Sequence, residues 1–179
     1  MKIEQKYQEG LKKLINENEL DEINVVMLCA AIKSNRQTFY YHYRDISDVV
    51  ESIFLKEKIG HGKVSYDFET NLKFLIAYIN NSYSFVSKIN NSYASDRLLS
   101  FFNSYFIQKI TLVFKAEGKD PATQRNVIRY LSTIFSNELV HWVANKRREK
   151  QQTLINRFMV IYNYFTTQYS VDLRKENAK

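Results

Sequence analysis

The chain has 179 residues, among them four Gly, one Pro, one Cys and three His, and its formal net charge is +7. So few glycines and prolines favour long helices over a β-rich fold with many tight turns. The single cysteine, Cys29, excludes an internal disulfide framework, and the three scattered histidines argue against a zinc site.

The positive charge is unevenly distributed. Residues 1–60 have a formal net charge of −1, whereas residues 61–179 have a formal net charge of +8. The overall basicity is therefore not the evidence for nucleic-acid binding, and we interpret the C-terminal excess as a solvated face with some non-specific attraction to polyanions. The start of the chain lacks a signal-peptide core, and no stretch reaches the ~18 consecutive apolar residues that span a membrane. We expect a cytoplasmic protein.

The chain opens with a predicted helix over residues 2–17, followed by a polar connection over 16–24. One face of this helix is apolar and carries Ile3, Tyr7, Leu11, Leu14 and Ile15.

Residues 24–54 predict two short helices and a longer third one, separated by gaps too short for independent packing. Asn24, Asn35 and Asp45 each stand where a side-chain oxygen can cap the helix that follows. Asp48, three residues after Asp45, resembles the second half of a capping box. Cys29 lies on the apolar face of the first short helix, so we interpret it as a core residue rather than a redox-active one. This spacing predicts a helix-turn-helix.

The second short helix, beginning at Arg36, carries side chains suited to DNA. Three basic residues and no acidic one lie between residues 33 and 44. Arg and Gln match the edges of guanine and adenine, whereas Thr, Tyr and His suit phosphate oxygens. Phe39 alone is expected to be fully buried, with Tyr40 either exposed or partly in the core. The candidate DNA-binding residues are Lys33, Asn35, Arg36, Gln37, Thr38, Tyr40, Tyr41 and His42.

The run RQTFYYHYRDISDVVESIF, residues 36–54, resembles the recognition helix and the following helix of TetR/AcrR-type transcriptional regulators. The family pattern is close to R-x-T-F-Y-x-H-F, and the branch that includes the DhaS-type regulators is the most similar. The resemblance implies phosphate contacts for Thr38, Tyr40 and His42, and leaves Gln37 and Tyr41 as candidates for base specificity. It also implies that the first helix begins near the DNA backbone, where Lys2 and Lys6 are either phosphate contacts or solvated side chains. The positions that match in register are Thr38, Phe39, Tyr40, His42 and the aromatic Tyr43.

Two positions depart from this pattern. The turn glycine of the family is Lys33 here, which must adopt a left-handed or distorted conformation at some cost. The apolar residue that usually follows is Ser34, which we expect to weaken the small core of the helix-turn-helix.

The segment GHGKVSYD, residues 60–67, is the clearest break in the chain, so we predict a DNA-binding domain over 1–60 and a helical effector-binding and dimerisation domain over 61–179. His61 is interpreted as a solvated linker residue rather than a pH-sensitive or ligand-binding group. Beyond the break, periodicity predicts helices over 68–91, 94–116, 121–147 and 151–171, with Pro121 opening the third and a frayed tail. The predicted fold class is all-α.

The resemblance also implies an effector site between the helices of the C-terminal domain and a homodimer formed by the last two helices, which places two recognition helices on a pseudo-palindromic operator. Aromatic residues at helical spacing are more often plain core than pocket lining. The candidates for the pocket are Tyr78, Tyr83, Phe85, Phe101, Phe102, Tyr105, Phe106, His141 and Trp142.

Motifs of catalysis are missing from the sequence, which contains no Gly-rich phosphate loop, no G-x-S-x-G elbow and no H-E-x-x-H pair. We therefore expect neither an enzyme nor a bound cofactor. The sequence indicates a DNA-binding transcriptional regulator, in the first interpretation a repressor released from DNA by a small-molecule effector. The alternative is a co-activator that depends on a protein partner. An exposed aromatic patch would favour the partner, and an enclosed apolar cavity would favour the effector.

Overall fold

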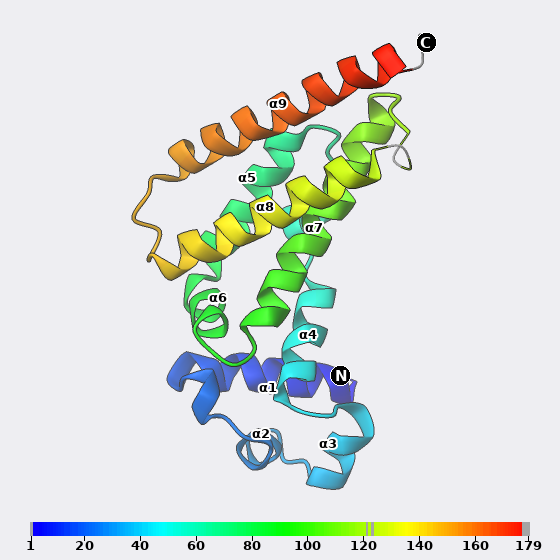
Figure 1. Cartoon of the computed structure of the whole chain (residues 1–179). Helices are drawn as coiled ribbons and strands as arrows, with labels where there is room; N and C mark the ends of the chain where they lie inside the picture. Colours follow the sequence, from blue (N-terminus) through cyan, green and yellow to red (C-terminus); the bar gives the residue numbers. More distant parts are fainter. Residues whose placement is uncertain (1, 121, 123, 177–179) are drawn as a thin grey trace. The chain divides into compact units, whose positions relative to one another are not determined.

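The computed structural model describes residues 2–120, 122 and 124–176, with the side chains of all but 61, 62 and 168–176. All regular secondary structure in this part of the chain is helical, which confirms the predicted fold class (Figure 1). The elements are α1 (Ile3–Glu17), η1 (Leu20–Glu22), α2 (Val25–Ala31), α3 (Arg36–His42), α4 (Ile46–Lys56), η2 (Ile59–Gly62), α5 (Phe68–Asn81), α6 (Tyr83–Asn90), α7 (Ser95–Ala116), α8 (Arg125–Ala144) and α9 (Gln151–Glu176).

The helices group into two compact units. The first contains residues 1–59 and 78–101, and the second contains residues 60–77 and the chain from 102 onward. Helices α5 and α7 therefore contribute residues to both units. The functional division into 1–60 and 61–179 stays a prediction, but the contacts group α6 and the first turns of α7 with the N-terminal helices.

The three predicted N-caps are all present. Asn24 Oδ1 accepts hydrogen bonds from the amides of residues 26 and 27 at 3.0 and 3.1 Å, and Asn35 Oδ1 accepts one from Thr38 N at 2.8 Å. Asp45 Oδ1 accepts one from Asp48 N at 2.9 Å. The capping box is wrong in one detail, because the Asp48 carboxylate accepts from Arg44 N at 3.0 Å rather than from the amide of the cap residue itself.

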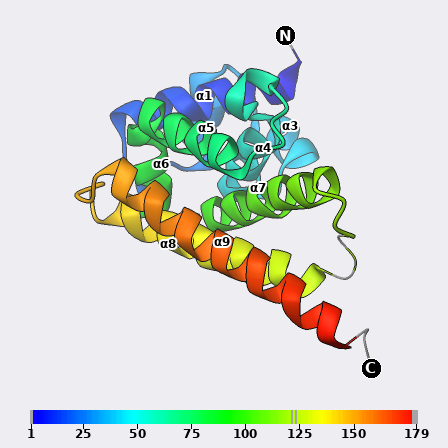
Figure 2. The same cartoon turned by 90° about the horizontal axis from the view of Figure 1, so that it is seen from above.

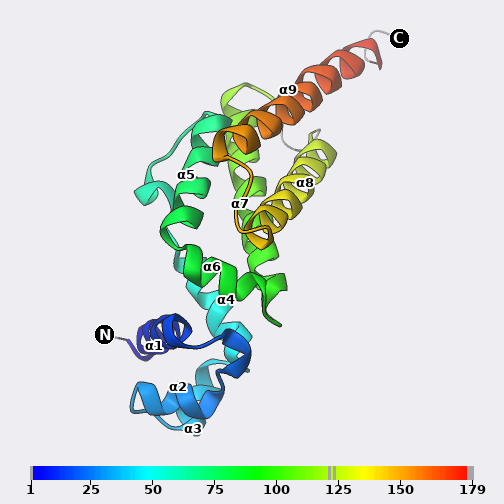
Figure 3. The ribbon, with the colours of Figure 1, turned by 90° about the vertical axis from the view of Figure 1, so that its left-hand side faces the viewer.

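The core of the first unit is built on α1, which contacts α2, α4 and α6; Figure 3 shows α2 and α3 together below it. Tyr7 is completely buried and meets Phe39 of α3 edge to face, with ring centroids 5.4 Å apart at 83°. Aromatic pairs of this geometry add to the free energy gained by burying the rings. The fully buried residues around them are Leu11, Ile15, Leu20, Leu28, Val49 and Val50.

Helix α6 and the start of α7 are tied to this core by charged side chains. Lys88 Nζ donates to the carbonyl oxygens of Ile15 and Asn18 at 2.8 and 3.1 Å, so a cation satisfies the carbonyl end of α1. Arg97, in the first turn of α7, forms an ion pair with Glu51 of α4 at 3.1 Å. These contacts explain why residues 78–101 belong to the first unit.

The core of the second unit is an aromatic cluster contributed by α5, α7, α8 and α9. Phe135 stacks on Phe158 at 4.5 Å, and Phe68 stacks on Tyr162 at 4.2 Å. Phe68 also lies 5.4 Å from Phe135, which joins the two pairs, and Phe106 lies 5.5 Å from Phe135. Helices α8 and α9 run beside each other in both Figure 1 and Figure 2.

The sequence misplaced some helix ends. The predicted helix over 68–91 is wrong because it breaks at Ser82, after two asparagines; such side chains compete with the backbone for its hydrogen bonds. Helix α9 continues to Glu176, beyond the predicted end at 171, so the tail is helical up to that residue. Pro121, the predicted start of α8, lies outside the described residues, as do the side chains of His61 and Tyr169.

None of the helices described is long and apolar enough to cross a membrane. Within the same part of the chain, His, Cys, Asp and Glu side chains do not gather in groups of three or more that could hold a metal ion.

Gly10 allows α1 and α2 to approach closely. A Cβ at this position would overlap with Ile32 Cγ2 and would lie 3.3 Å from Leu28 Cδ1. We expect Gly10→Ala to lower the free energy of unfolding by roughly 1–2 kcal/mol, since overpacking outweighs the gain in helix propensity. Urea unfolding followed by circular dichroism measures this. In an Ile32→Ala background, which removes the obstructing methyl group, the same change should be neutral or stabilising; an equal loss in both backgrounds would contradict the explanation.

Candidate nucleic-acid interface

In the turn between α2 and α3, Lys33 adopts a left-handed backbone conformation with a φ of 55°. Ser34 N donates to Cys29 O at 2.8 Å and Lys33 N donates to Ala30 O at 3.2 Å, the hydrogen-bond pattern of a Schellman motif. The left-handed conformation predicted for Lys33 is therefore confirmed. It costs a residue with a side chain about 1–2 kcal/mol.

Ser34 has a polar partner at the edge of the core, while its expected weakening of that core stays a prediction. Its hydroxyl lies 2.7 Å from the hydroxyl of Tyr7, so the two groups hydrogen-bond to each other beside the core. Burial raises the pKa of Tyr7, and the phenol stays protonated and able to donate. The polar residue in the turn is thus matched by a polar atom on α1, a long-range pairing that the local pattern did not reveal.

Helix α3 presents most of the predicted DNA-binding side chains to solvent. Phe39 is completely buried and anchors the helix, as predicted, whereas Tyr40 and Tyr41 are 57% and 85% exposed. Of the two interpretations of Tyr40, the structure confirms the exposed one. Thr38 is half-buried, and the exposed residues alongside are Lys33, Asn35, Arg36 and Gln37.

His42, at the end of α3, is half-buried. Its Nδ1 lies 3.6 Å from a carboxylate oxygen of Glu4, near the start of α1, and its ring meets Tyr41 edge to face at 5.0 Å. The imidazole therefore has an acidic side chain beside it. Its role in DNA binding stays a prediction.

The predicted pocket residues lie in several environments. Phe102 and Phe106 are completely buried, and Tyr105 donates its hydroxyl hydrogen to Asn71 O at 2.8 Å. His141 and Trp142 border a hollow of about 410 Å³ in the second unit, where Trp142 Nε1 donates to Glu149 O at 2.9 Å.

In the first unit, Tyr78 borders a hollow of about 280 Å³ together with the ion pair of Lys12 and Glu57. Burial raises the pKa of the Tyr78 phenol, so it is protonated at neutral pH. Tyr83, on α6, is half-buried. An effector site stays a prediction.

Sequence reasoning missed Tyr7, Gly10 and Arg44 as determinants of this interface. The sequence signal for the close approach of α1 and α2 was Gly10, in the middle of a predicted helix. A glycine there lowers helix stability, so its presence indicates a packing requirement. Arg44 follows Tyr43, the C-cap residue of α3, and its guanidinium forms an ion pair with Asp48 at 2.7 Å.

The architecture is a helical one in which a short exposed helix follows a tight turn and is fixed by a small core. Among solved structures, the chain is similar to "Dihydroxyacetone kinase operon activator DhaS", with a TM-score of 0.64 and 17% sequence identity, over 94% of this chain and 96% of that one. At this identity the likeness establishes a shared fold. No protein-family model matches the chain, and none of the curated proteins matches it either.

The hydroxyl pair between Tyr7 and Ser34 is expected to stabilise the turn. Tyr7→Phe and Ser34→Ala should each lower the free energy of unfolding by about 1 kcal/mol, the usual contribution of such a hydrogen bond. The double variant should lose little more than either single one, because both remove the same interaction. Circular dichroism during urea unfolding measures all three, with the exposed Tyr41→Phe as the control. Strictly additive losses would show that the two hydroxyls act independently.

Proposed function

We propose that this chain is a transcriptional regulator that binds a pseudo-palindromic operator through α3 and acts in the cytoplasm. The observation that carries the proposal is the exposure of Arg36, Gln37 and Tyr41 on a short helix anchored by Phe39. Such a helix can enter the major groove with its polar side chains directed at base edges, while neighbouring residues contact phosphates. The shared fold with an operon activator supports the same function.

Within this proposal the side chains of α3 divide into two roles. Gln37 and Tyr41 read bases together with Arg36, whose guanidinium suits guanine. Thr38, Tyr40 and His42 contact the DNA backbone, with Lys33 and Asn35 beside them. Asn35 Oδ1 is already engaged as the helix cap, so its amide nitrogen is the part available for a phosphate.

We also propose a homodimer formed by α8 and α9. Tyr130 and Ile134 are exposed four residues apart on α8, and Val160 and Tyr164 are exposed four residues apart on α9. Side chains at this spacing share one face of a helix, so each helix leaves an apolar stripe in contact with solvent. Two copies that bury these stripes would present two α3 helices to symmetric half-sites.

In its first form the regulator is a repressor released by a small molecule. The effector would prefer a conformation in which the two α3 helices no longer match the operator, and its binding would shift the population toward that conformation. The hollow beside His141 and Trp142 is a candidate place for it in the second unit.

A second form, a co-activator that depends on a protein partner, is favoured by two observations. The similar solved structure carries the description of an operon activator. Phe102 and Phe106, two of the predicted pocket residues, fill a core. A reporter fused to the bound promoter separates the two forms, because deleting a repressor raises expression and deleting an activator lowers it.

Operator binding is tested by fluorescence anisotropy with the DNA upstream of the chain's own gene, at two salt concentrations and with scrambled competitor DNA. We expect saturable binding that survives the competitor and weakens with salt. The double variant Arg36→Ala, Tyr41→Ala should lose most of it, since each base contact contributes about 1–3 kcal/mol of discrimination. The matched control, Tyr66→Ala with Arg148→Ala, replaces an exposed tyrosine and an exposed arginine of the second unit. Equal affinity of both double variants would contradict the assignment of α3.

The dimer is tested by light scattering after size exclusion. We expect a mass near twice the 21.3 kDa of one chain. Ile134→Glu should shift the protein toward the mass of one chain, because a buried carboxylate without a partner is strongly unfavourable in an apolar interface. The control Val64→Glu changes an exposed apolar residue outside α8 and α9 and should leave the mass unchanged. A single-chain mass for the unaltered protein would rule out the dimer.

A further inference from the structure

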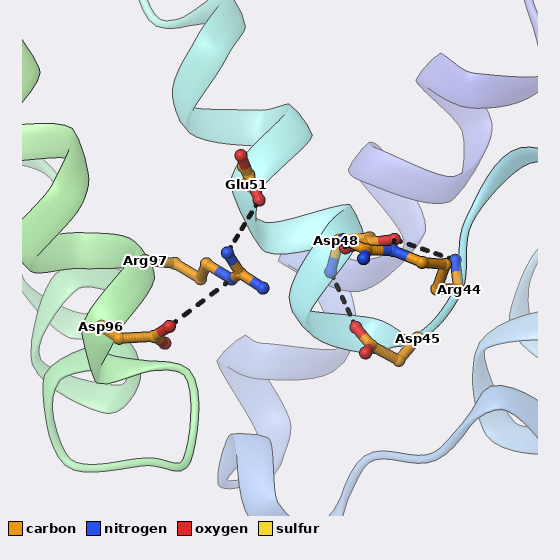
Figure 4. A network of polar contacts seen from close by, with 6 residues as sticks. All are labelled: Arg44, Asp45, Asp48, Glu51, Asp96 and Arg97. Carbon is orange, nitrogen blue, oxygen red and sulfur yellow. Dashed lines mark hydrogen bonds and ion pairs between the residues drawn. The ribbon is translucent and has the colours of Figure 1, made fainter.

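The polar network at the start of α4 centres on two arginines (Figure 4). Arg44 Nε and Nη2 donate to the two carboxylate oxygens of Asp48, each at 2.7 Å, and the amide of Arg44 donates to the same carboxylate at 3.0 Å. One carboxylate therefore holds both the side chain and the backbone of the residue that leads from α3 into α4.

Asp48 is itself held in place. Its side chain is only 15% exposed, and its amide donates to Asp45 Oδ1. The hydrogen bond from Arg44 is the main cause that lowers the pKa of Asp48, so the carboxylate is charged at any pH at which the protein would meet DNA. A fixed and charged acceptor restricts the rotamers of the arginine that it binds.

The guanidinium of Arg44 is nevertheless open to solvent, because its side chain is 79% exposed. A guanidinium has five N–H donors, and Asp48 uses one on Nε and one on Nη2, which leaves three directed elsewhere. An arginine that is already oriented loses less conformational entropy when it binds a second anion.

Arg44 also lies beside the surface that we assign to DNA. It follows His42, the last residue of α3, by two positions, which keeps their Cα atoms within about 7 Å. The planar fork of arginine matches two phosphate oxygens at once. An extended arginine at this place therefore reaches the backbone of a duplex whose groove holds α3.

Several acidic side chains surround the two arginines. Asp45, Asp48, Glu51 and Asp96 all belong to the network, and Arg97 pairs with Glu51 at 3.1 Å and with Asp96 at 3.8 Å (Figure 4). By charge alone, removing any of these carboxylates would reduce the repulsion of DNA and strengthen binding. If Asp48 orients Arg44 toward DNA, its removal would instead weaken binding.

We infer that Arg44 is a further contact to the DNA backbone and that Asp48 is the residue that positions it. The inference rests on the proposed function and adds a binding residue outside α3. An exposed ion pair contributes little to folding stability. Stability alone therefore accounts poorly for the three hydrogen bonds between Arg44 and Asp48.

The test measures operator affinity by fluorescence anisotropy over a range of salt concentrations for the unaltered chain and five variants. Arg44→Gln should weaken binding about tenfold or more, the usual effect of removing a hydrogen bond to a charged group. It should also flatten the slope of log K against log salt by about 0.9 for each phosphate that is no longer neutralised, hence by about 1.8 for a dimer. Arg44→Lys should keep the slope, because the charge remains, and bind less tightly because the fork geometry is absent.

Asp48→Glu is the variant that separates geometry from charge. It keeps the net charge and displaces the carboxylate, so we expect weaker binding with an unchanged slope. Asp48→Asn should also bind more weakly, against the direction that charge alone gives. The matched control Glu51→Gln removes a carboxylate one turn along α4 that does not touch Arg44, and it should bind as tightly as the unaltered chain or more tightly.

Circular dichroism of each variant shows whether its helices are intact. If Asp48→Asn unfolds, Asp48→Glu still tests the positioning role. An unchanged slope for Arg44→Gln would overturn the assignment of Arg44 to the DNA backbone, and affinities of both Asp48 variants at or above that of the unaltered chain would overturn the positioning role. Failure of the unaltered chain to bind its operator would instead contradict the proposed function itself.

Discussion

The buried phenol of Tyr7 is the point on which the N-terminal unit depends. Its ring contacts Phe39, which anchors α3, and Tyr43, which ends that helix. Its hydroxyl reaches the turn through Ser34. One side chain of α1 therefore contacts the middle of the exposed helix, its C-terminal end and the turn that precedes it. One turn further along α1, Gly10 lets the end of α2 lie against the same helix, which also helps to position the turn.

The parts of the fold that depend on neighbouring residues were predictable. Asn24, Asn35 and Asp45 cap the helices that follow them, since a short polar side chain and an apolar-periodic run are sufficient to define a cap. The left-handed turn at Lys33 was predictable for a different reason, because the sequence pattern that this segment resembles has a glycine at that position. The break at Ser82 was not, because apolar residues continue at helical spacing on both sides of it and the periodicity alone shows no interruption.

The candidate interface was predictable as a set of exposed residues and not as a set of contacts. A buried Phe39 between polar neighbours follows from the helical period, and the exposure of Tyr41 follows with it. The ion pairs of His42 with Glu4 and of Arg97 with Glu51 join residues far apart in the chain, so no local pattern contains them. Between residues 33 and 44 the sequence has no acidic residue, yet the folded chain brings Glu4 and Asp48 to that segment. The electrostatic character of the surface is thus a property of the tertiary structure.

The position of the only tryptophan determines what optical spectroscopy can report. Trp142 donates its indole hydrogen to Glu149 O at the turn between α8 and α9, in the second unit. The first unit contains tyrosine and phenylalanine but no tryptophan. Intrinsic tryptophan emission therefore senses the end of α8 directly, while loosening of α1 to α4 would leave that fluorophore in its own local environment. Tyrosine absorbance or an isotopic label in α3 would be the appropriate reporter for the part of the molecule that we propose binds DNA.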